Sequence, residues 1–222
     1  MATTFLNLRY WTQNLVGDPQ MSTYSYQMYV DALNFACIDY ATKTGATYKE
    51  VGSLVPDASG FVVIPATYIR LQRVYHMVGG TVQTELVEST IFFESSKSNV
   101  WSAVSGVPKR WVLFNASKVK LTPIPSPVYT AVVGFVDTPT AFTFTGVLAT
   151  DDAQTPDTLI PALHMEHLKY AATSWLLLID GDSQDIGKSA NYMDKFNELI
   201  GYKDPVLDAK LASSRTQPER EL

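Results

Sequence analysis

The sequence predicts an α+β fold in which an antiparallel β module is inserted into a helical bundle, with an extended C-terminal tail. Apolar residues recur at three- and four-residue steps near the beginning of the chain and again after residue 160, which places them on one face of a helix. Between these stretches lie short runs of β-branched and aromatic residues, bounded by Gly, Pro, Ser or Asn as antiparallel strands usually are. The predicted order is therefore helices, strands, helices.

Two helices are expected in the N-terminal part, and we assign residues 1–58 to this portion of the bundle. The first runs from about Thr3 to Val16 and ends at Gly17-Asp18-Pro19. The second begins after Ser25, a residue type that caps helices, and ends at Gly45. Its apolar stripe is formed by Tyr26, Tyr29, Val30, Leu33, Cys37, Tyr40 and Ala41.

Residues 59–137 are expected to form the antiparallel β module. A hairpin is predicted from Arg70–Val78 and Val82–Val87, because the Gly79-Gly80 pair between them suits a tight turn. The remaining strand candidates are Phe61–Ile64, Arg110–Asn115, Lys118–Pro123 and Val128–Asp137. Residues 138–157 mix apolar and acidic side chains and are predicted to form a loop.

The bundle is expected to resume over residues 158–202 as two antiparallel helices joined by a short turn. The first begins near Pro161, where the missing N–H is tolerated, and Gly181 separates it from the second. Their apolar faces are formed by His164, Leu168, Ala171, Trp175 and Ile179, and by Ile186, Ala190, Met193, Phe196 and Ile200. Residues 203–222 are polar, and we expect them to be a tail that folds onto a partner.

Composition limits the classes of function. With 46% hydrophobic and 18% charged residues, the 222-residue chain has enough apolar material for a sizeable core. The formal charge is -5 and no dense Lys/Arg run occurs, so tight binding of nucleic acid is not expected. No signal peptide is visible, and the apolar stretch Ala171–Ile179 is too short to span a bilayer, so no membrane association is expected.

The histidines near residue 165 are the first candidates for metal chemistry. His164, Glu166 and His167 belong to the segment H-M-E-H, whose first three residues match the H-x-E half of a zinc deaminase signature. The P-C-x-x-C half is missing because Cys37 is the only cysteine. Metal ligation and a helix-surface or interface position are the two readings, and the spacing favours the second.

The remaining candidates for catalysis are weaker. Cys37 falls on an apolar helical stripe and is interpreted as a core residue, whereas the adjacent acids Asp151 and Asp152 are interpreted as solvated. We therefore predict no catalytic, cofactor-binding or metal-binding residue and no enzymatic activity. The cluster Tyr24, Tyr26 and Tyr29 suits either a protein–protein surface or an ordinary core.

The order and spacing of several segments resemble a known family. These segments are 26–36 (YQMYVDALNFA), 60–65 (GFVVIP), 71–74 (LQRV), 106–111 (GVPKRW), 119–125 (VKLTPIP), 159–161 (LIP), 170–172 (YAA) and 185–196. Together they resemble the head-to-tail adaptor, or connector, proteins of tailed bacteriophages, over most of the chain from about Ser22 to Tyr202.

The resemblance implies a structural virion protein. Such adaptors form a ring, usually of twelve copies, that binds the portal, extends the DNA channel and provides a platform for tail (nozzle or fibre) proteins. DNA would pass through without tight binding, and the protein would occupy the host cytoplasm before assembly. Residues 203–222 would contact the portal, and the portal-binding residues assigned there are Arg215, Gln217, Glu219 and Arg220. The alternatives are another tail component, such as a tail completion or tube protein, and, less favoured, an enzyme.

Overall fold

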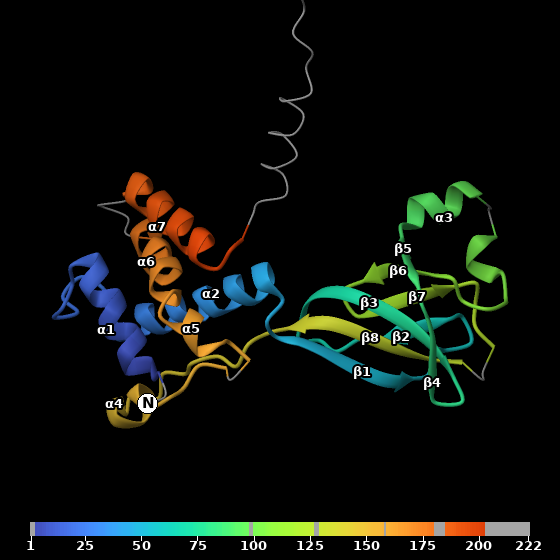
Figure 1. Ribbon diagram of the computed structural model, residues 1–222, viewed down its shortest axis with the longest axis horizontal. Coiled ribbons are helices and arrows are strands. Elements are labelled where there is room, and N and C mark those ends of the chain that lie inside the picture. The colour runs from blue at the N-terminus through green and yellow to red at the C-terminus, as the bar shows by residue number, and fades with distance from the viewer. Residues whose placement is uncertain (1–2, 98–99, 127–128, 158, 180–184, 203–222) are drawn as a thin grey trace, which may run out of the picture. The chain divides into compact units, whose positions relative to one another are not determined.

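The computed structural model describes residues 3–97, 100–126, 129–157, 159–179 and 185–202, and these form two compact units (Figure 1). The helical unit comprises the chain up to residue 46 and from residue 139 onward, and the β unit comprises residues 47–138. The α+β class is confirmed. The chain thus leaves the helical unit once, forms the β unit and returns.

The helical unit combines helices from the N-terminal and C-terminal parts of the chain. Its helices are α1 (Phe5–Val16), α2 (Tyr26–Thr44), α4 (Leu148–Asp152), α5 (Ala162–Met165), α6 (Leu168–Ile179) and α7 (Ile186–Leu199). Helix α6 packs against α1, α2 and α7. The long helix expected after Pro161 is divided into α5 and α6, and the predicted loop 138–157 contains the short helix α4.

Local chemistry sets the helix ends. The Ser25 side chain accepts a hydrogen bond from the Met28 N–H at 3.3 Å and begins α2, and the Asp185 side chain does the same for Lys188 N–H at 2.8 Å at the start of α7. Helix α2 ends at Gly45, whose φ of 70° lies in the left-handed region that glycine adopts without strain. The N-cap and C-cap predicted for α2 are therefore confirmed.

The core of the helical unit consists of aromatic and aliphatic side chains from helices far apart in the sequence. Tyr29 and Leu33 from α2, Leu176 from α6 and Phe196 from α7 are fully buried in one cluster. Burying a side chain of this size contributes about 1.5–3 kcal/mol relative to leaving it exposed. This shared core joins the N-terminal helices to the C-terminal ones.

The loop between α1 and α2 is organised by the buried carboxylate of Asp18. It accepts hydrogen bonds from the backbone N–H groups of Ser22 at 2.7 Å and Tyr24 at 2.9 Å, and from the Tyr29 hydroxyl at 3.3 Å. Burial alone raises the pKa of this carboxyl, but the hydrogen bonds from the Tyr24 and Ser22 N–H groups outweigh it, so the net pKa lies below the ordinary value.

Replacing Asp18 with Asn should therefore make the helical unit less stable near neutral pH, with a smaller difference in acid. A carboxyl whose pKa is lower when folded contributes stability that is present above its unfolded pKa of 3.8 and is lost as pH falls through the folded value. The free energy of unfolding should be measured for both proteins between about pH 7 and pH 3. A difference that does not change with pH would show that Asp18 is not held as a carboxylate.

The β unit contains two four-stranded sheets. Its elements are β1 (Tyr48–Leu54), β2 (Phe61–Val63), β3 (Tyr68–Val78), β4 (Thr81–Glu85), β5 (Val87–Ser89), α3 (Ile91–Lys97), the 3₁₀ turn η1 (Trp101–Ala103), β6 (Arg110–Asn115), β7 (Lys118–Thr122) and β8 (Tyr129–Asp137). The strand orders are β1-β8-β3-β4 and β2-β7-β6-β5. One core is formed from both sheets by residues that include Val74, Trp111, Leu121 and Phe135.

The predicted hairpin is only partly correct. Strand β4 pairs with β3 as expected, but the predicted partner Val82–Val87 is divided at the buried residue Leu86. The Leu86 N–H still donates to Val74 O at 2.7 Å in the first sheet, whereas the Val87 N–H donates to Lys109 O at 3.1 Å in the second. Strand β5 then pairs parallel with β6, so the β module is not antiparallel throughout.

Strand β1 was not expected, because the segment 1–58 was assigned to helices. It pairs antiparallel with β8 at one edge of its sheet, and its register shifts between Val51 and Leu54. Ser53, within this shift, has a φ of 57°. An irregular edge strand with Lys49 and Glu50 exposed lacks the alternating apolar pattern by which strands are recognised in a sequence.

Candidate assembly surfaces

Asp151 and Asp152 are structural residues of the helical unit, and their interpretation as solvated acids was wrong. The Asp152 carboxylate accepts two hydrogen bonds from Arg9 Nη2, at 3.0 and 3.1 Å, and one from the Tyr26 hydroxyl at 3.0 Å. Asp151 is fully buried and accepts from the Thr145 hydroxyl at 2.7 Å. Removing a carboxylate from water is costly unless it is paired or hydrogen-bonded, and both carboxylates meet this condition here.

These acids hold the segment 139–157 against α1 and α2. The Phe5 N–H donates to Gln154 O at 2.7 Å, and the Asn34 side chain bonds both backbone groups of Phe142, at 2.7 and 3.0 Å. The segment therefore has a defined conformation although it contains only the five residues of α4 as regular structure.

The turn that leads into α4 exposes a group of apolar side chains. Phe144, Val147 and Leu148 are 46%, 57% and 54% exposed, and we call them the turn patch. The Asp151 carboxylate lies beneath this turn, where it also accepts from the Thr145 N–H at 3.1 Å and the Gly146 N–H at 3.2 Å. The turn patch is therefore held in place by hydrogen bonds to the buried Asp151 carboxylate beneath it.

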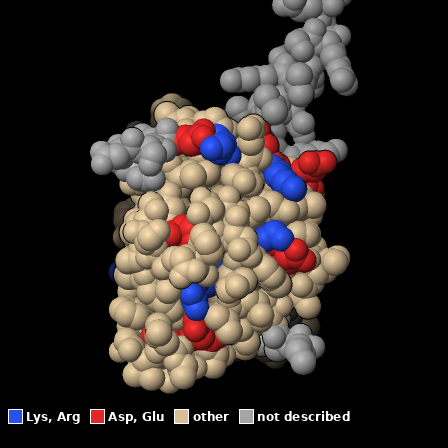
Figure 2. Space-filling model, turned by 90° about the vertical axis from the view of Figure 1, so that its left-hand side faces the viewer, with Lys and Arg blue, Asp and Glu red and all other residues tan. Residues whose placement is uncertain are grey.

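Figure 2 shows one face of the helical unit, on which basic and acidic side chains are scattered among uncharged ones. At several places on this face a basic and an acidic side chain lie side by side (Figure 2). In the same unit, Lys169 and Glu166 form an ion pair at 2.6 Å. A surface that grips a nucleic-acid backbone would present a continuous basic stripe, and this face has none.

In the β unit, helix α3 presents its aromatic side chains outward. Glu94 is the buried residue of this helix, whereas Phe92 is 84% and Phe93 47% exposed. Val87 of β5, 64% exposed, lines a hollow together with Phe93. We call Val87, Phe92 and Phe93 the α3 patch. Exposed apolar groups of this kind mark interaction surfaces.

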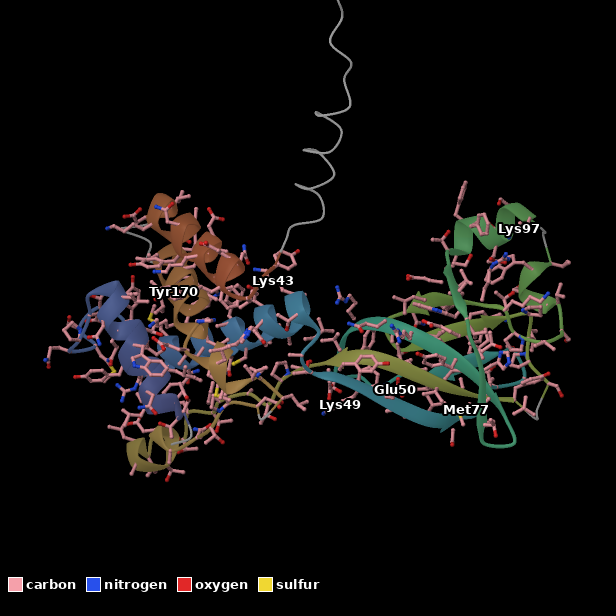
Figure 3. All side chains as sticks on the ribbon, viewed as in Figure 1. Lys43, Lys49, Glu50, Met77, Lys97 and Tyr170 are labelled. Carbon is pink, nitrogen blue, oxygen red and sulfur yellow. The ribbon has the colours of Figure 1, made fainter. Side chains whose placement is uncertain are left out.

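Positive charge accompanies the α3 patch. Lys97 Nζ lies 3.9 Å from the centroid of the Phe93 ring (Figure 3). Glu94 is shared by Arg110, at 3.4 Å, and the Ser89 hydroxyl, at 2.6 Å. Lys97 and Lys109 line the adjacent pocket, and in the described part of the chain neither has a carboxylate within ion-pair distance.

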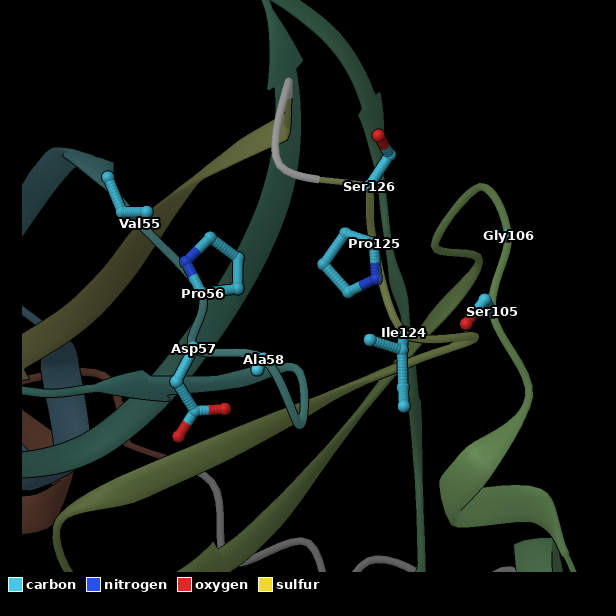
Figure 4. Close-up of a pocket in the computed structure, with 9 residues that line it drawn as sticks. All are labelled: Val55, Pro56, Asp57, Ala58, Ser105, Gly106, Ile124, Pro125 and Ser126. Atoms are coloured by element: carbon cyan, nitrogen blue, oxygen red, sulfur yellow. The ribbon is translucent and has the colours of Figure 1, made fainter.

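Figure 4 shows a pocket of the β unit with a volume of about 590 Å³. Its lining is formed by Val55, Pro56, Asp57, Ala58, Ser105, Gly106, Ile124, Pro125 and Ser126. Asp57 is the one acid or base in this lining, and hydrogen bonds from the Phe61 and Ser59 N–H groups hold its pKa below the ordinary value. A carboxylate engaged in this way, without a neighbouring base, does not form a nucleophile–base pair.

The candidate residues for metal and thiol chemistry are partly or fully buried in the helical unit. The His164 and His167 rings lie 5.6 Å apart, and burial, followed by the neighbouring His164, lowers the pKa of His167. No group of three or more His, Cys, Asp or Glu side chains that could hold a metal occurs among the described residues. Cys37 is a core residue as predicted, and burial raises the pKa of its thiol to about 12.

The tyrosines of the α2 region belong to the core. Tyr24, Tyr26 and Tyr29 are 4%, 9% and 0% exposed, so of the two readings left open by the sequence the core reading is correct. The sequence-predicted portal contacts Arg215, Gln217, Glu219 and Arg220 lie outside the described residues, as does Gly181.

Comparison with known families identifies the chain. The family model for the SU10 adaptor protein matches residues 3–219, nearly the whole length. The chain belongs to the SU10 adaptor protein family. The adaptor family is one of structural phage proteins and not of enzymes, and the resemblance to phage head-to-tail adaptors is confirmed. No curated protein matches the chain.

Two further findings apply to the described part of the adaptor. No described helix is long and apolar enough to cross a membrane. The exposed apolar groups identified above lie on elements that sequence patterns did not single out, namely α3 and the turn before α4. Sequence reasoning missed both, and the signal that was available is the Ile-Phe-Phe run at 91–93, which neither alternates nor repeats at helical steps.

Proposed function

We propose that this adaptor joins the portal to the tail as a ring of copies, with twelve as the expected number. The ring would extend the DNA channel and provide the platform to which tail nozzle or fibre proteins attach. The observation that carries this proposal is the family match over residues 3–219. The protein would be part of the virion at the head–tail interface and would occupy the host cytoplasm before assembly.

The charge distribution supports passage of DNA without tight binding. The chain carries 22 acidic and 17 basic residues, and the face in Figure 2 has no basic stripe. Each phosphate contact adds affinity and obstructs sliding, so a channel subunit benefits from few of them. A dissociation constant for duplex DNA below about 1 μM at physiological salt would contradict this part of the proposal.

We propose that residues 203–222 contact the portal, through Arg215, Gln217, Glu219 and Arg220. Their polar composition and their position directly after α7 support this role. A polar segment that becomes ordered on a partner can cover a large surface of that partner.

Deleting residues 203–222 should weaken portal binding at least about tenfold, which corresponds to about 1.4 kcal/mol. The measurement is size-exclusion chromatography with light scattering on the adaptor alone, the portal alone and their mixture. The matched control replaces the same twenty residues with a Gly/Ser segment of equal length, which should behave like the deletion. A truncated adaptor that binds portal as the full chain does would show that the contact lies elsewhere. A full-length adaptor that ignores portal would favour another tail component.

A further inference from the structure

The α3 patch is an exposed surface that no other element covers among the described residues of the β unit. Of the seven residues of α3, only Glu94 is buried. The inward-facing side chain of the helix is therefore a carboxylate, which pairs with Arg110, and the rings of Phe92 and Phe93 are exposed. Burying apolar surface contributes about 25 cal/mol per Å². A partner that covered Phe92 and Phe93 would therefore gain favourable free energy of binding.

The turn patch has the same character in the helical unit. Phe144 packs one side of its ring against Tyr26, with centroids 5.0 Å apart, and remains half exposed on the other. The hydrogen bonds between Asp151 and the Thr145–Gly146 backbone fix the turn, so little conformational entropy would be lost when a partner docks there.

The two patches carry opposite charge. Residues 139–157 contain Asp151, Asp152 and Asp157 and no Lys or Arg. Arg9 offsets Asp152, and no other described cation lies within ion-pair distance of this segment. The α3 patch is bordered by Lys97 and Lys109, which have no such carboxylate partner. The acid Glu88 and the Arg110–Glu94 ion pair also lie beside it, so its surroundings are net positive. Complementary charge around two apolar surfaces favours their association and selects its orientation.

We infer that the α3 patch of one copy docks on the turn patch of a second copy. This inference rests on the proposed function, because it names the contact between neighbouring copies of the ring. The two surfaces differ, so the contact is heterologous, and a pair of copies retains one unused α3 patch and one unused turn patch. Repetition of the same contact adds further copies.

Two single variants test this contact. Phe92→Asp blocks the α3 patch and Leu148→Asp blocks the turn patch, and both positions are more than half exposed, so the folds should persist. Each variant alone should associate at least about tenfold more weakly than the wild-type adaptor in sedimentation equilibrium. An equimolar mixture of the two variants should form a one-to-one dimer and nothing larger. The turn patch of Phe92→Asp and the α3 patch of Leu148→Asp are intact and can bind each other, and no second intact pair remains.

The matched controls are Val55→Asp in the β unit and Leu163→Asp in the helical unit, which are 70% and 77% exposed and lie outside both patches. They should change self-association less than about twofold. The inference is overturned if the two variants do not complement each other, if the controls weaken association equally, or if the wild-type adaptor does not self-associate either alone or on the portal.

The same proteins separate this inference from the proposed function. Both patch variants keep residues 203–222, so they should still bind portal as individual copies, with fewer copies retained per portal than for the wild type. Portal that retains the variants in wild-type number overturns the contact but leaves the adaptor function standing. Wild-type adaptor that forms the dimer contact but does not bind portal supports the contact and contradicts the portal-binding role.

Discussion

Replacing Asp152 with Ala should destabilise the helical unit by about 3 kcal/mol. The substitution leaves the Arg9 guanidinium, with a side chain only 10% exposed, without its carboxylate partner. It also removes the acceptor of the Tyr26 hydroxyl, and burial together with that carboxylate holds the pKa of Tyr26 far above the ordinary value. Leaving a buried hydrogen-bond donor without an acceptor destabilises the folded state by more than the net contribution of the bond to stability.

The loss should be measured by hydrogen exchange in peptides from α1 and α2, because the two units need not unfold together. The control is Glu166→Ala, which removes a carboxylate 58% exposed from its pair with Lys169 and should change stability by less than about 1 kcal/mol. Equal effects of the two substitutions would show that the Arg9–Asp152 pair behaves as a surface ion pair.

Replacing Phe196 with Ala should destabilise the helical unit by about 3–5 kcal/mol. The Phe196 ring is fully buried in the core that joins the N-terminal and C-terminal helices, and Lys43 Nζ lies 5.3 Å from its centroid. The substitution leaves a cavity and removes the cation–ring contact. Because Phe196 is a fully buried residue of α7, we also expect faster hydrogen exchange of the α7 backbone amides.

The matched control for Phe196 is Leu199→Ala on the same helix, at a position 38% exposed. Both substitutions introduce Ala on the same helix, so the difference between them reports the lost core packing of Phe196 together with its contact to Lys43. A loss at Phe196 no greater than at Leu199 would contradict the assignment of α7 to the core.

Helix α2 was predictable because its signals are local. Ser25 and Gly45 mark its ends, and the apolar stripe from Tyr26 to Ala41 repeats at helical steps. The adaptor family was recognisable for a related reason, since short turn and strand segments kept a characteristic order and spacing. The family model confirms that reading over residues 3–219.

The strands were harder to predict because pairing partners lie far apart in the sequence. Nothing local in Thr81–Ser89 indicates that the chain changes sheets at Leu86, and only the partners Val74 and Lys109 reveal it. Strand β1 has an exposed edge and few buried side chains, so its sequence lacks the alternation that a central strand shows.

The sequence by itself determined the ends of α2, the placement of most strands after about residue 60 and the membership of a phage adaptor family. Those features depend on the chemistry of near neighbours in the chain. Tertiary structure alone decided that Asp151 is buried, that Asp152 is partly buried and that Phe92 and Phe93 are exposed. Burial depends on which distant groups approach: an acid is buried where Arg9, Tyr26 and Thr145 supply donors, and an aromatic ring stays exposed where Glu94 already occupies the inner face.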